Sequence, residues 1–321
     1  MLHTKLCDLF GIEHPIILAP MGSATSADFA AAMSNAGGLG GIGTFSRARA
    51  DILDDLSRIR SLTNRPFNVN HVPQAVDEAV FAETLRLRPT VISFSLGDPG
   101  EMVEMAKAAG STVMLQVTTV EQARMGAERG VDVIIAQGGE AGGFGGMIST
   151  MVLVPQVVDA VAPIPVVAAG GIYDGRGLAA ALMLGAVGVN MGTRFLASRE
   201  APISESWKQA ILAAQSQDAI KARAIHALEP DPDYPGFETV LRSLHTPFLD
   251  QWNDRPDEVA AQRDRLNVEI EELHENGRGH EVVLTAGQGA GAINEVLPVA
   301  EIVRRVVTEA EQALASGFAN A

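Results

Sequence analysis

The sequence predicts an α/β fold, a (β/α)8 barrel of the TIM type that carries a helical insertion after its eighth strand. Eight short apolar runs alternate with helical stretches over the first 200 residues, and each apolar run is nearly continuous. Alternating strands and helices imply parallel pairing through crossover helices, and continuous apolar strands are typical of a sheet buried on both faces. An open doubly wound sheet is the alternative, because strand order cannot be read from the pattern.

The predicted strands are short runs rich in Val, Ile and Ala. They are 15–21, 38–43, 67–72, 90–97, 112–119, 131–137, 164–171 and 185–193. Alanine-rich or charged stretches with helical spacing separate most of them. These predicted helices are 26–35, 50–60, 99–109, 120–129 and 177–184.

After residue 199 the alternation stops. Polar helical stretches at 204–214 and 255–275 are joined by the turn-rich segment 229–236, which predicts a helical insertion. Periodicity returns in the run 284–291 and in 296–313, where apolar residues keep the spacing of an amphipathic helix. We therefore expect the barrel to comprise residues 1–200 and 286–321, and the insertion to comprise residues 201–285.

Composition and charge narrow the range of functions. The chain has 321 residues, 47% of them hydrophobic, without an apolar segment of bilayer length or a basic leader, which predicts a cytoplasmic protein. A formal charge of −15 argues against nucleic acid or an anionic membrane as partner, because both favour clustered Lys and Arg. We expect a small-molecule substrate, and the sequence leaves a homodimer open as the assembly.

The chain shows no pattern typical of a metal site. Its single cysteine, Cys7, excludes an internal disulfide and a cysteine-based zinc site, and we expect it to pack in the core. The seven histidines are scattered, and none is paired with another at ligand spacing. No bound metal is therefore expected.

The segment 137–146 is the most informative loop of the chain. It reads QGGEAGGFGG and directly follows a predicted strand. Glycine allows backbone to approach a flat ligand closely, at a cost in conformational entropy that a binding role would offset. The alternative is a flexible connector.

Unusual residues stand where predicted strands end, and functional loops of a barrel follow those ends. Gly170-Gly171 and Gly192-Thr193 follow strands seven and eight, where barrels commonly bind phosphate through backbone N–H groups. Arg194 could add a charge if it turns inward, or form a surface ion pair. The full set of expected cofactor contacts is Pro20, Met21, Gly22, Asn70, Gln116, Gln137, Gly142, Gly170, Gly171, Asn190, Met191, Gly192 and Thr193.

A phosphate site, a glycine platform and amide side chains together suit flavin mononucleotide (FMN). Its ring system needs hydrogen-bond partners along one polar edge, and the side chains of Asn70 and Gln137 can supply them. Two structural alternatives remain open. Asn70 could cap the following turn, and Gln137 could satisfy a neighbouring carbonyl.

Several motifs together resemble one family. They are PIILAPMG at 15–22, SNAGGLGGIG at 34–43, PFNVN at 66–70, VTTVEQA at 117–123, AAGGIYDG at 168–175, GVNMGTRFLA at 188–197, and the segments 136–146 and 286–298. In these the chain resembles the nitronate monooxygenases, formerly called 2-nitropropane dioxygenases, and their relatives the flavin-dependent enoyl-acyl-carrier-protein reductases and NADH:quinone reductases. The resemblance implies an FMN-binding barrel with cofactor contacts at Asn70, Gln137, Gly142, Gly171 and 190–193.

Two residues depart from the pattern of that family. The family usually has histidine as catalytic base or hydrogen-bond partner where this chain has Phe144, and commonly has glutamine where this chain has Asn190. Phenylalanine cannot move a proton, so a neutral nitroalkane would lack its base. An alkyl nitronate is already an anion, which favours nitronate oxidation with O₂ as the main hypothesis.

Two further hypotheses stay open. Phe144 could form an apolar face for an enoyl thioester or a quinone, reduced by NADH or NADPH through the flavin. Alternatively, the chain could be a phosphate-binding barrel without redox chemistry. A replacement base is also conceivable: we single out His71, beside Asn70, and then Tyr173, His226, Tyr234 and His245.

Overall fold

The computed structural model describes residues 2–228 and 239–316. Eight parallel strands form one sheet in the order β1-β9-β8-β6-β5-β4-β3-β2. The sheet closes on itself, because the Leu18 N–H donates to the Leu39 carbonyl (2.9 Å) and the Leu39 N–H donates to the Ile16 carbonyl (2.9 Å). All eight predicted strands are present, the barrel is confirmed, and the open-sheet alternative is wrong.

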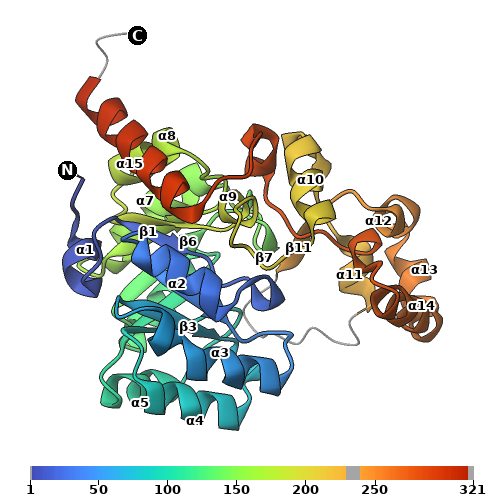
Figure 1. Ribbon diagram of the computed structural model, residues 1–321, viewed down its shortest axis with the longest axis horizontal. Helices are drawn as coiled ribbons and strands as arrows, with labels where there is room; N and C mark the ends of the chain where they lie inside the picture. Colours follow the sequence, from blue (N-terminus) through green and yellow to red (C-terminus); the bar gives the residue numbers. More distant parts are fainter. Residues whose placement is uncertain (1, 229–238, 317–321) are drawn as a thin grey trace.

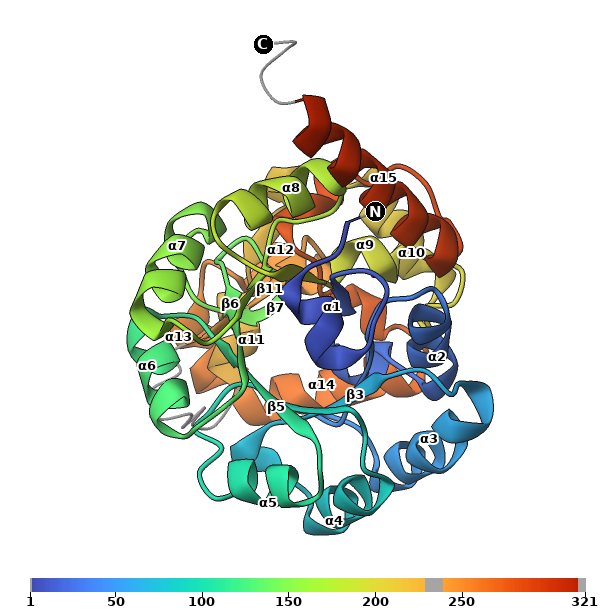
Figure 2. The same ribbon diagram turned by 90° about the vertical axis from the view of Figure 1, so that its left-hand side faces the viewer.

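Each barrel strand lies within its predicted run and is shorter than that run. They are β1 (Ile16–Leu18), β2 (Gly40–Gly43), β3 (Phe67–His71), β4 (Val91–Phe94), β5 (Thr112–Val117), β6 (Val133–Gln137), β8 (Val166–Ala169) and β9 (Gly188–Met191). Helices surround them, as seen along the barrel in Figure 2. These helices are α2 (Ala27–Asn35), α3 (Arg49–Leu62), α4 (Glu78–Leu87), α5 (Met102–Ala108), α6 (Val120–Glu128), α7 (Thr150–Val161), α8 (Gly175–Met183), α9 (Thr193–Leu196) and α15 (Val299–Ser316).

Side-chain caps start several of the outer helices soon after a strand ends. Ser26, Asp77, Thr119 and Asp174 each accept a hydrogen bond from a backbone N–H in the first turn of α2, α4, α6 and α8. Such caps satisfy N–H groups that the helix itself leaves unpaired. The amphipathic helix α15 packs against α8 and completes the ring on that side (Figure 1).

The apolar side chains form two layers, one inside the barrel and one between the strands and the helices. Neighbouring residues of a strand alternate between these layers, as Ile16 (outer), Ile17 (inner) and Leu18 (outer) show. The short helix α1 (Lys5–Phe10) contributes to the inner layer and lies across one end of the barrel in Figure 2. Cys7 on α1 is buried there at 2% exposure, which confirms its packing role.

A lobe of helices and strands, which lies between α9 and α15 in the chain, stands beside the barrel (Figure 1). Its helices are α10 (Glu205–Ala213), α11 (Arg223–Leu228), α12 (Pro247–Trp252), α13 (Pro256–Ala261) and α14 (Arg263–Glu275). The expectation of helices alone needs a correction, because the lobe also holds strands β10 (Ala219–Lys221) and β11 (Val240–Leu244). The predicted turn segment 229–236, with Tyr234, lies outside the described residues.

The glycine loop contributes a third strand to that small sheet. Strand β7 (Gly143–Gly145) pairs antiparallel with β11, which also pairs with β10. The loop is therefore held by backbone hydrogen bonds and is not a flexible connector. No helix among residues 2–228 and 239–316 is long and apolar enough to cross a bilayer.

Candidate active site

A cavity of about 670 Å³ opens at the carboxyl ends of the barrel strands and extends under the insertion. This is the end at which barrel enzymes place their functional loops, and the volume is typical of ligand pockets. Twelve of the thirteen expected cofactor contacts line it. They are Pro20, Met21, Gly22, Asn70, Gln116, Gln137, Gly142, Gly170, Gly171, Asn190, Gly192 and Thr193.

Met191 is the expected contact that does not line the cavity. Its side chain is 1% exposed and packs in the outer layer between the strands and the helices. Because side chains alternate along a strand, the inward position of Asn190 turns Met191 outward. The prediction of a cofactor contact from Met191 is therefore wrong for its side chain.

The two glycine turns expected to bind phosphate lie side by side. Strands β8 and β9 are neighbours, with Ala169 paired to Asn190, so the turns that follow them share one edge of the cavity. Gly170 and Gly171 have φ values of 98° and 70°, a backbone conformation that favours glycine. The hydroxyl of Thr193 accepts a hydrogen bond from the Gly287 N–H (2.9 Å), which ties the segment after the insertion to this turn.

A network of polar contacts fixes the first of these turns. The Glu140 carboxylate accepts hydrogen bonds from the Thr150 N–H (2.9 Å) and the Thr150 hydroxyl (2.9 Å). The same hydroxyl lies 2.9 Å from the carbonyl oxygen of Gly170. The glycine loop is thus linked through Thr150 to the turn after β8, so the two expected cofactor-binding loops are held as one unit.

Some glycines of the loop allow other segments of the protein to pack closely against its backbone. A Cβ atom on Gly142 would lie 2.6 Å from the carbonyl carbon of Ala286 and 2.6 Å from the nitrogen of Gly287. A Cβ on Gly138 would lie 2.0 Å from the Thr150 hydroxyl. These glycines are needed for close approach of backbone, although the sequence alone suggested a ligand as the approaching group.

The amide side chains of the cavity differ in whether their polar atoms have hydrogen-bond partners. The Asn70 Nδ2 donates to the Ser93 hydroxyl (3.0 Å), and its Oδ1 accepts from the Ser95 hydroxyl (3.3 Å). The Gln137 Oε1 and the Asn190 Oδ1 are buried without a hydrogen-bond partner among the described residues. An unpaired buried carbonyl costs free energy. Both atoms belong to residues that line the cavity, so a ligand with N–H donors would satisfy them.

Phe144 gives one side of the cavity an apolar edge. It lies in β7, is paired with Leu241 of β11, and packs edge to face on Phe45 with ring centroids 6.0 Å apart. Ser46 and Leu96 also line the cavity, and both have positive φ values, 54° and 57°. Non-glycine residues in this conformation are strained and concentrate at functional sites.

His71 does not face the cavity. Its side chain is fully buried, its Nε2 lies 3.1 Å from the Thr84 hydroxyl, and its ring packs on Phe81 and Phe94. Asn70 faces the barrel interior, so the alternation along β3 turns His71 the other way. The hypothesis that His71 replaces the missing base is therefore wrong.

Burial of His71 predicts a pH dependence of folding. Desolvation lowers the pKa of His71 from 6.5 to about 4. Between these values the unfolded chain binds a proton that the folded chain does not, so stability falls as the pH falls. We expect the free energy of unfolding to drop by about 3 kcal/mol between pH 7 and pH 4 from this group. Urea unfolding of His71→Leu should lack that part of the slope, and exposed His245→Gln should keep it. An unchanged slope in His71→Leu would contradict the assignment.

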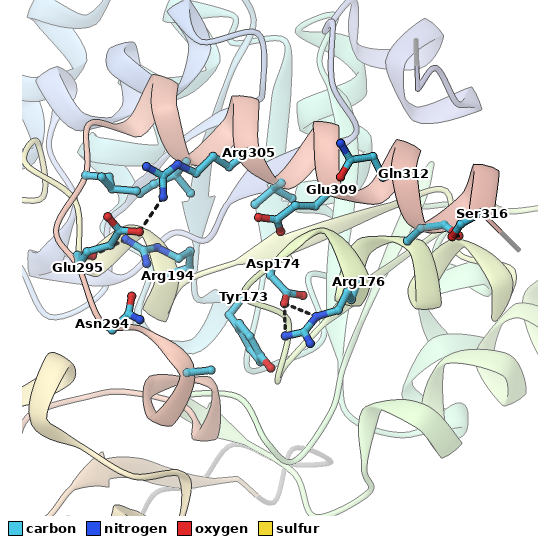
Figure 3. Close-up of a pocket in the computed structure, with 15 residues that line it drawn as sticks. Tyr173, Asp174, Arg176, Arg194, Asn294, Glu295, Arg305, Glu309, Gln312 and Ser316 are labelled. Carbon is cyan, nitrogen blue, oxygen red and sulfur yellow. Dashed lines mark hydrogen bonds and ion pairs between the residues drawn. The ribbon is translucent and has the colours of Figure 1, made fainter. Parts of the chain in front are cut away.

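Arg194 turns away from the phosphate-binding turns. It is 8% exposed, and its Nη2 donates to the carbonyl oxygens of Ala197 (3.0 Å) and Glu295 (2.8 Å). It lines a second pocket of about 570 Å³ between α8 and α15, where Figure 3 shows it beside Glu295. Burial lowers the pKa of Arg194. It is neither a phosphate ligand nor half of a surface ion pair with a carboxylate.

The other candidates for a base fall in different places. Tyr173 lines the cavity, whereas His226 and His245 do not, and His245 is exposed and bonded to Asp250 (2.6 Å). The sequence analysis missed His274 and His280, which line the cavity from the insertion. It also missed Phe45, Ser46, Ser95, Leu96, Trp207 and Leu241. No local signal marks these residues, because their position depends on how the insertion and the loops fold over the barrel.

Comparison with known proteins agrees with the geometry. The model of the nitronate monooxygenase family matches residues 3–86 and 74–309. The chain belongs to the nitronate monooxygenase family. The members of this family are generally flavoproteins.

Three relatives of this family member illustrate its range. A nitronate monooxygenase of Pseudomonas aeruginosa is 32% identical over 368 residues, covering 94% of this chain and 97% of that protein. The structure of FabK from Thermotoga maritima matches with a TM-score of 0.88 and 34% identity over 98% of both chains. The (3aS,4S,5R,7aS)-5-hydroxy-7a-methyl-1-oxo-octahydro-1H-indene-4-carboxyl-CoA dehydrogenase of Rhodococcus jostii is 39% identical over 232 residues, or 71% of this chain. The chain spans only 64% of the length of that dehydrogenase.

Proposed function

We propose that this family member binds FMN in the cavity and oxidises small alkyl nitronates with O₂. The observation that carries the proposal is the pair of buried, unpartnered amide oxygens on Gln137 and Asn190 beside two adjoining glycine turns. Oxidised FMN has one ring N–H donor, at N3, and hydroxyl donors on its ribityl chain for such oxygens, and backbone at glycine turns suits a phosphate. The residues present thus fit the cofactor.

Each part of the site has a role in this proposal. The turns at 170–171 and 192–193 would hold the phosphate, and the amides of Asn70, Gln137 and Asn190 would hold the polar edge of the ring. Bound FMN would supply the electron acceptor for the oxidation. We assign FMN binding to the barrel, residues 1–200 and 286–321, and cover of the substrate to the insertion, residues 201–285.

Phe144 supports the proposal of an anionic substrate. Phe144 lines the cavity next to β11, and its ring packs on Phe45. A phenyl ring can neither accept nor donate a proton. A nitronate needs no proton removed from carbon before its oxidation. The two rings and Leu241 would orient the substrate and exclude water from its apolar side.

The second candidate is the reduction of an enoyl thioester or a quinone by NAD(P)H. The apolar edge formed by Phe45, Phe144 and Leu241 favours it, because flat acceptors pack well on such a surface. The similarity to FabK and to a carboxyl-CoA dehydrogenase supports it as well. A phosphate-binding barrel without redox chemistry is the third candidate.

The visible spectrum of the purified protein separates the three candidates. We expect a flavin spectrum that ethyl nitronate bleaches without O₂ and that O₂ restores. Bleaching by NADH or NADPH, with none by nitronate, would favour the second candidate. A protein that stays colourless after incubation with FMN would favour the third. The cytoplasmic location and the homodimer stay predictions from the sequence, and light scattering of the same sample tests the homodimer.

A further inference from the structure

The wall of the cavity carries very few ionisable side chains. Among the described residues that line it, these are Tyr173, His274 and His280, and no Lys, Arg, Asp or Glu is present. The two imidazoles are thus the groups of this wall that can carry a positive charge. The chain as a whole has a formal charge of −15, so the global field repels an anionic ligand. An anionic substrate therefore needs local attraction at this place.

The segment that carries His280 is fixed to the sheet of the insertion. The carbonyl of Val282 accepts a hydrogen bond from the Thr246 hydroxyl (2.9 Å). The Leu284 N–H donates to the Ser243 hydroxyl (2.9 Å), and the Leu284 carbonyl accepts from the Leu244 N–H (2.9 Å). Ser243 and Leu244 belong to β11, the strand that pairs with the strand of Phe144. His280 is thus anchored through β11 to the wall that holds the Phe144 ring.

His274 lies next to the same segment. It stands in the last turn of α14, and a Cβ atom on Gly279 would lie 3.2 Å from its Nε2. The ring therefore packs against the backbone of the residue that precedes His280. No hydrogen bond or ion pair joins the imidazole of His274 or His280 to another residue in the described part of the chain. Their ring N–H groups are available to a ligand.

We propose that His274 and His280 form the anion-binding entrance of the cavity and select oxyanionic substrates. The inference rests on the proposed function, because it assigns to these residues the recognition of the nitronate oxygens. Two imidazolium N–H groups would donate charge-assisted hydrogen bonds to an oxyanion. A neutral nitroalkane of the same shape gains much less from them. His274 and His280 thus determine substrate specificity, although they lie far from the barrel motifs in the sequence.

The charged groups around His274 and His280 do not cancel the attraction of these two residues for anions. Glu281 adjoins His280, but its carboxylate is bonded to Arg278 (2.6 Å and 2.7 Å). Glu275 adjoins His274 at the end of α14 and is exposed. From the barrel side, Tyr173 lines the same cavity. Glu281 is thus paired mainly with Arg278, and the charge of His280 contributes less to the lowered pKa of its carboxyl. Glu275 is open to solvent, which screens its charge.

The test uses the FMN-loaded protein and nitrate, an inert oxyanion with the planar shape of a nitronate group. NMR spectra of histidine-labelled protein are recorded with increasing nitrate at pH 5.5 and at pH 8.5, and signals are assigned with His274→Gln and His280→Gln. We expect saturable shifts of both signals at pH 5.5 and much smaller shifts at pH 8.5, because an anion binds a protonated imidazole more strongly than a neutral one. His245, exposed and paired with Asp250, is the matched control. Shifts no larger than those of His245 would overturn the inference.

A kinetic measurement separates this inference from the proposed function. We expect His280→Gln to raise the KM for ethyl nitronate about tenfold and to leave kcat within about twofold, because a charge-assisted hydrogen bond is lost in binding. His245→Gln should change neither constant. Nitrate binding without nitronate turnover would refute the proposed activity and keep the anion site. Turnover with an unchanged KM in both His274→Gln and His280→Gln would refute the anion site and keep the activity.

Discussion

Replacement of Gly170 by alanine is expected to weaken FMN binding at least tenfold. At Gly170 the φ is 98°, and an added Cβ would lie 2.8 Å from the carbonyl oxygen of Gly138 and 3.0 Å from the Thr150 hydroxyl. The strain of such a φ costs about 1 to 2 kcal/mol. The contact with Gly138 must also be relieved by moving backbone, which shifts the turn that we expect to hold the phosphate. The dissociation constant of FMN, measured by flavin fluorescence, tests this expectation.

Gly110→Ala is the matched control for that variant. Gly110 has a φ of 91°, and an added Cβ would have no atom within 4 Å. Both variants therefore carry similar backbone strain, but only Gly170→Ala disturbs the turn after β8. We expect both to lower the melting temperature and only Gly170→Ala to weaken FMN binding. Equal FMN affinities in the two variants would remove the turn at Gly170 from the cofactor site.

Replacement of Phe144 by histidine is expected to raise the turnover of neutral nitroethane about 100-fold. A positioned general base typically contributes a factor of about 10² to 10⁴, and the Phe144 ring lies on the cavity wall where this family usually has histidine. Oxidation of ethyl nitronate should change little, because its proton is already absent. The ratio of the two activities therefore reports on proton removal and not on the amount of folded protein.

Phe144→Leu serves as the control, because it also removes the ring but adds no base. Both variants lose the edge-to-face contact with Phe45, so a common effect on the two activities measures that packing. A gain with nitroethane in Phe144→His alone would show that the missing base limits turnover. If neither variant gains activity with the neutral substrate, the account of Phe144 is wrong.

The barrel could be predicted because its signals are local. A strand buried on both faces must be continuously apolar, as in β6 and β8, and this is visible within a few residues. Caps such as Ser26 and Asp174 likewise act within one turn of helix. Closure of the barrel, by contrast, depends on the parallel bridge between Ile17 and Leu39. The sequence indicated closure only through the number of repeated strand–helix units.

Most strand-end residues that we expected to contact the cofactor line the cavity, and the side chains that do not line it share one cause. Asn70 faces the cavity and His71 does not, and Asn190 faces it whereas Met191 does not. In each pair the two neighbours lie on opposite faces of one strand. Which face is inside depends on the register of the whole barrel, so the local motif could not assign it.

By itself the sequence determined the eight-strand barrel, the family and most residues at the carboxyl ends of the strands, because these depend on patterns within single elements. Only the tertiary structure decided that the glycine loop is a strand of the insertion sheet, that Arg194 faces a second pocket, and that His274 and His280 reach the cavity. The first two placements rest on contacts between segments about 100 residues apart, namely the pairing of Phe144 with Leu241 and the hydrogen bond from Arg194 to Glu295. The third rests on contacts such as the hydrogen bond from the Leu284 N–H to Ser243, which are 41 residues apart. Such contacts form only when the intervening chain has folded, and no short stretch of sequence records them.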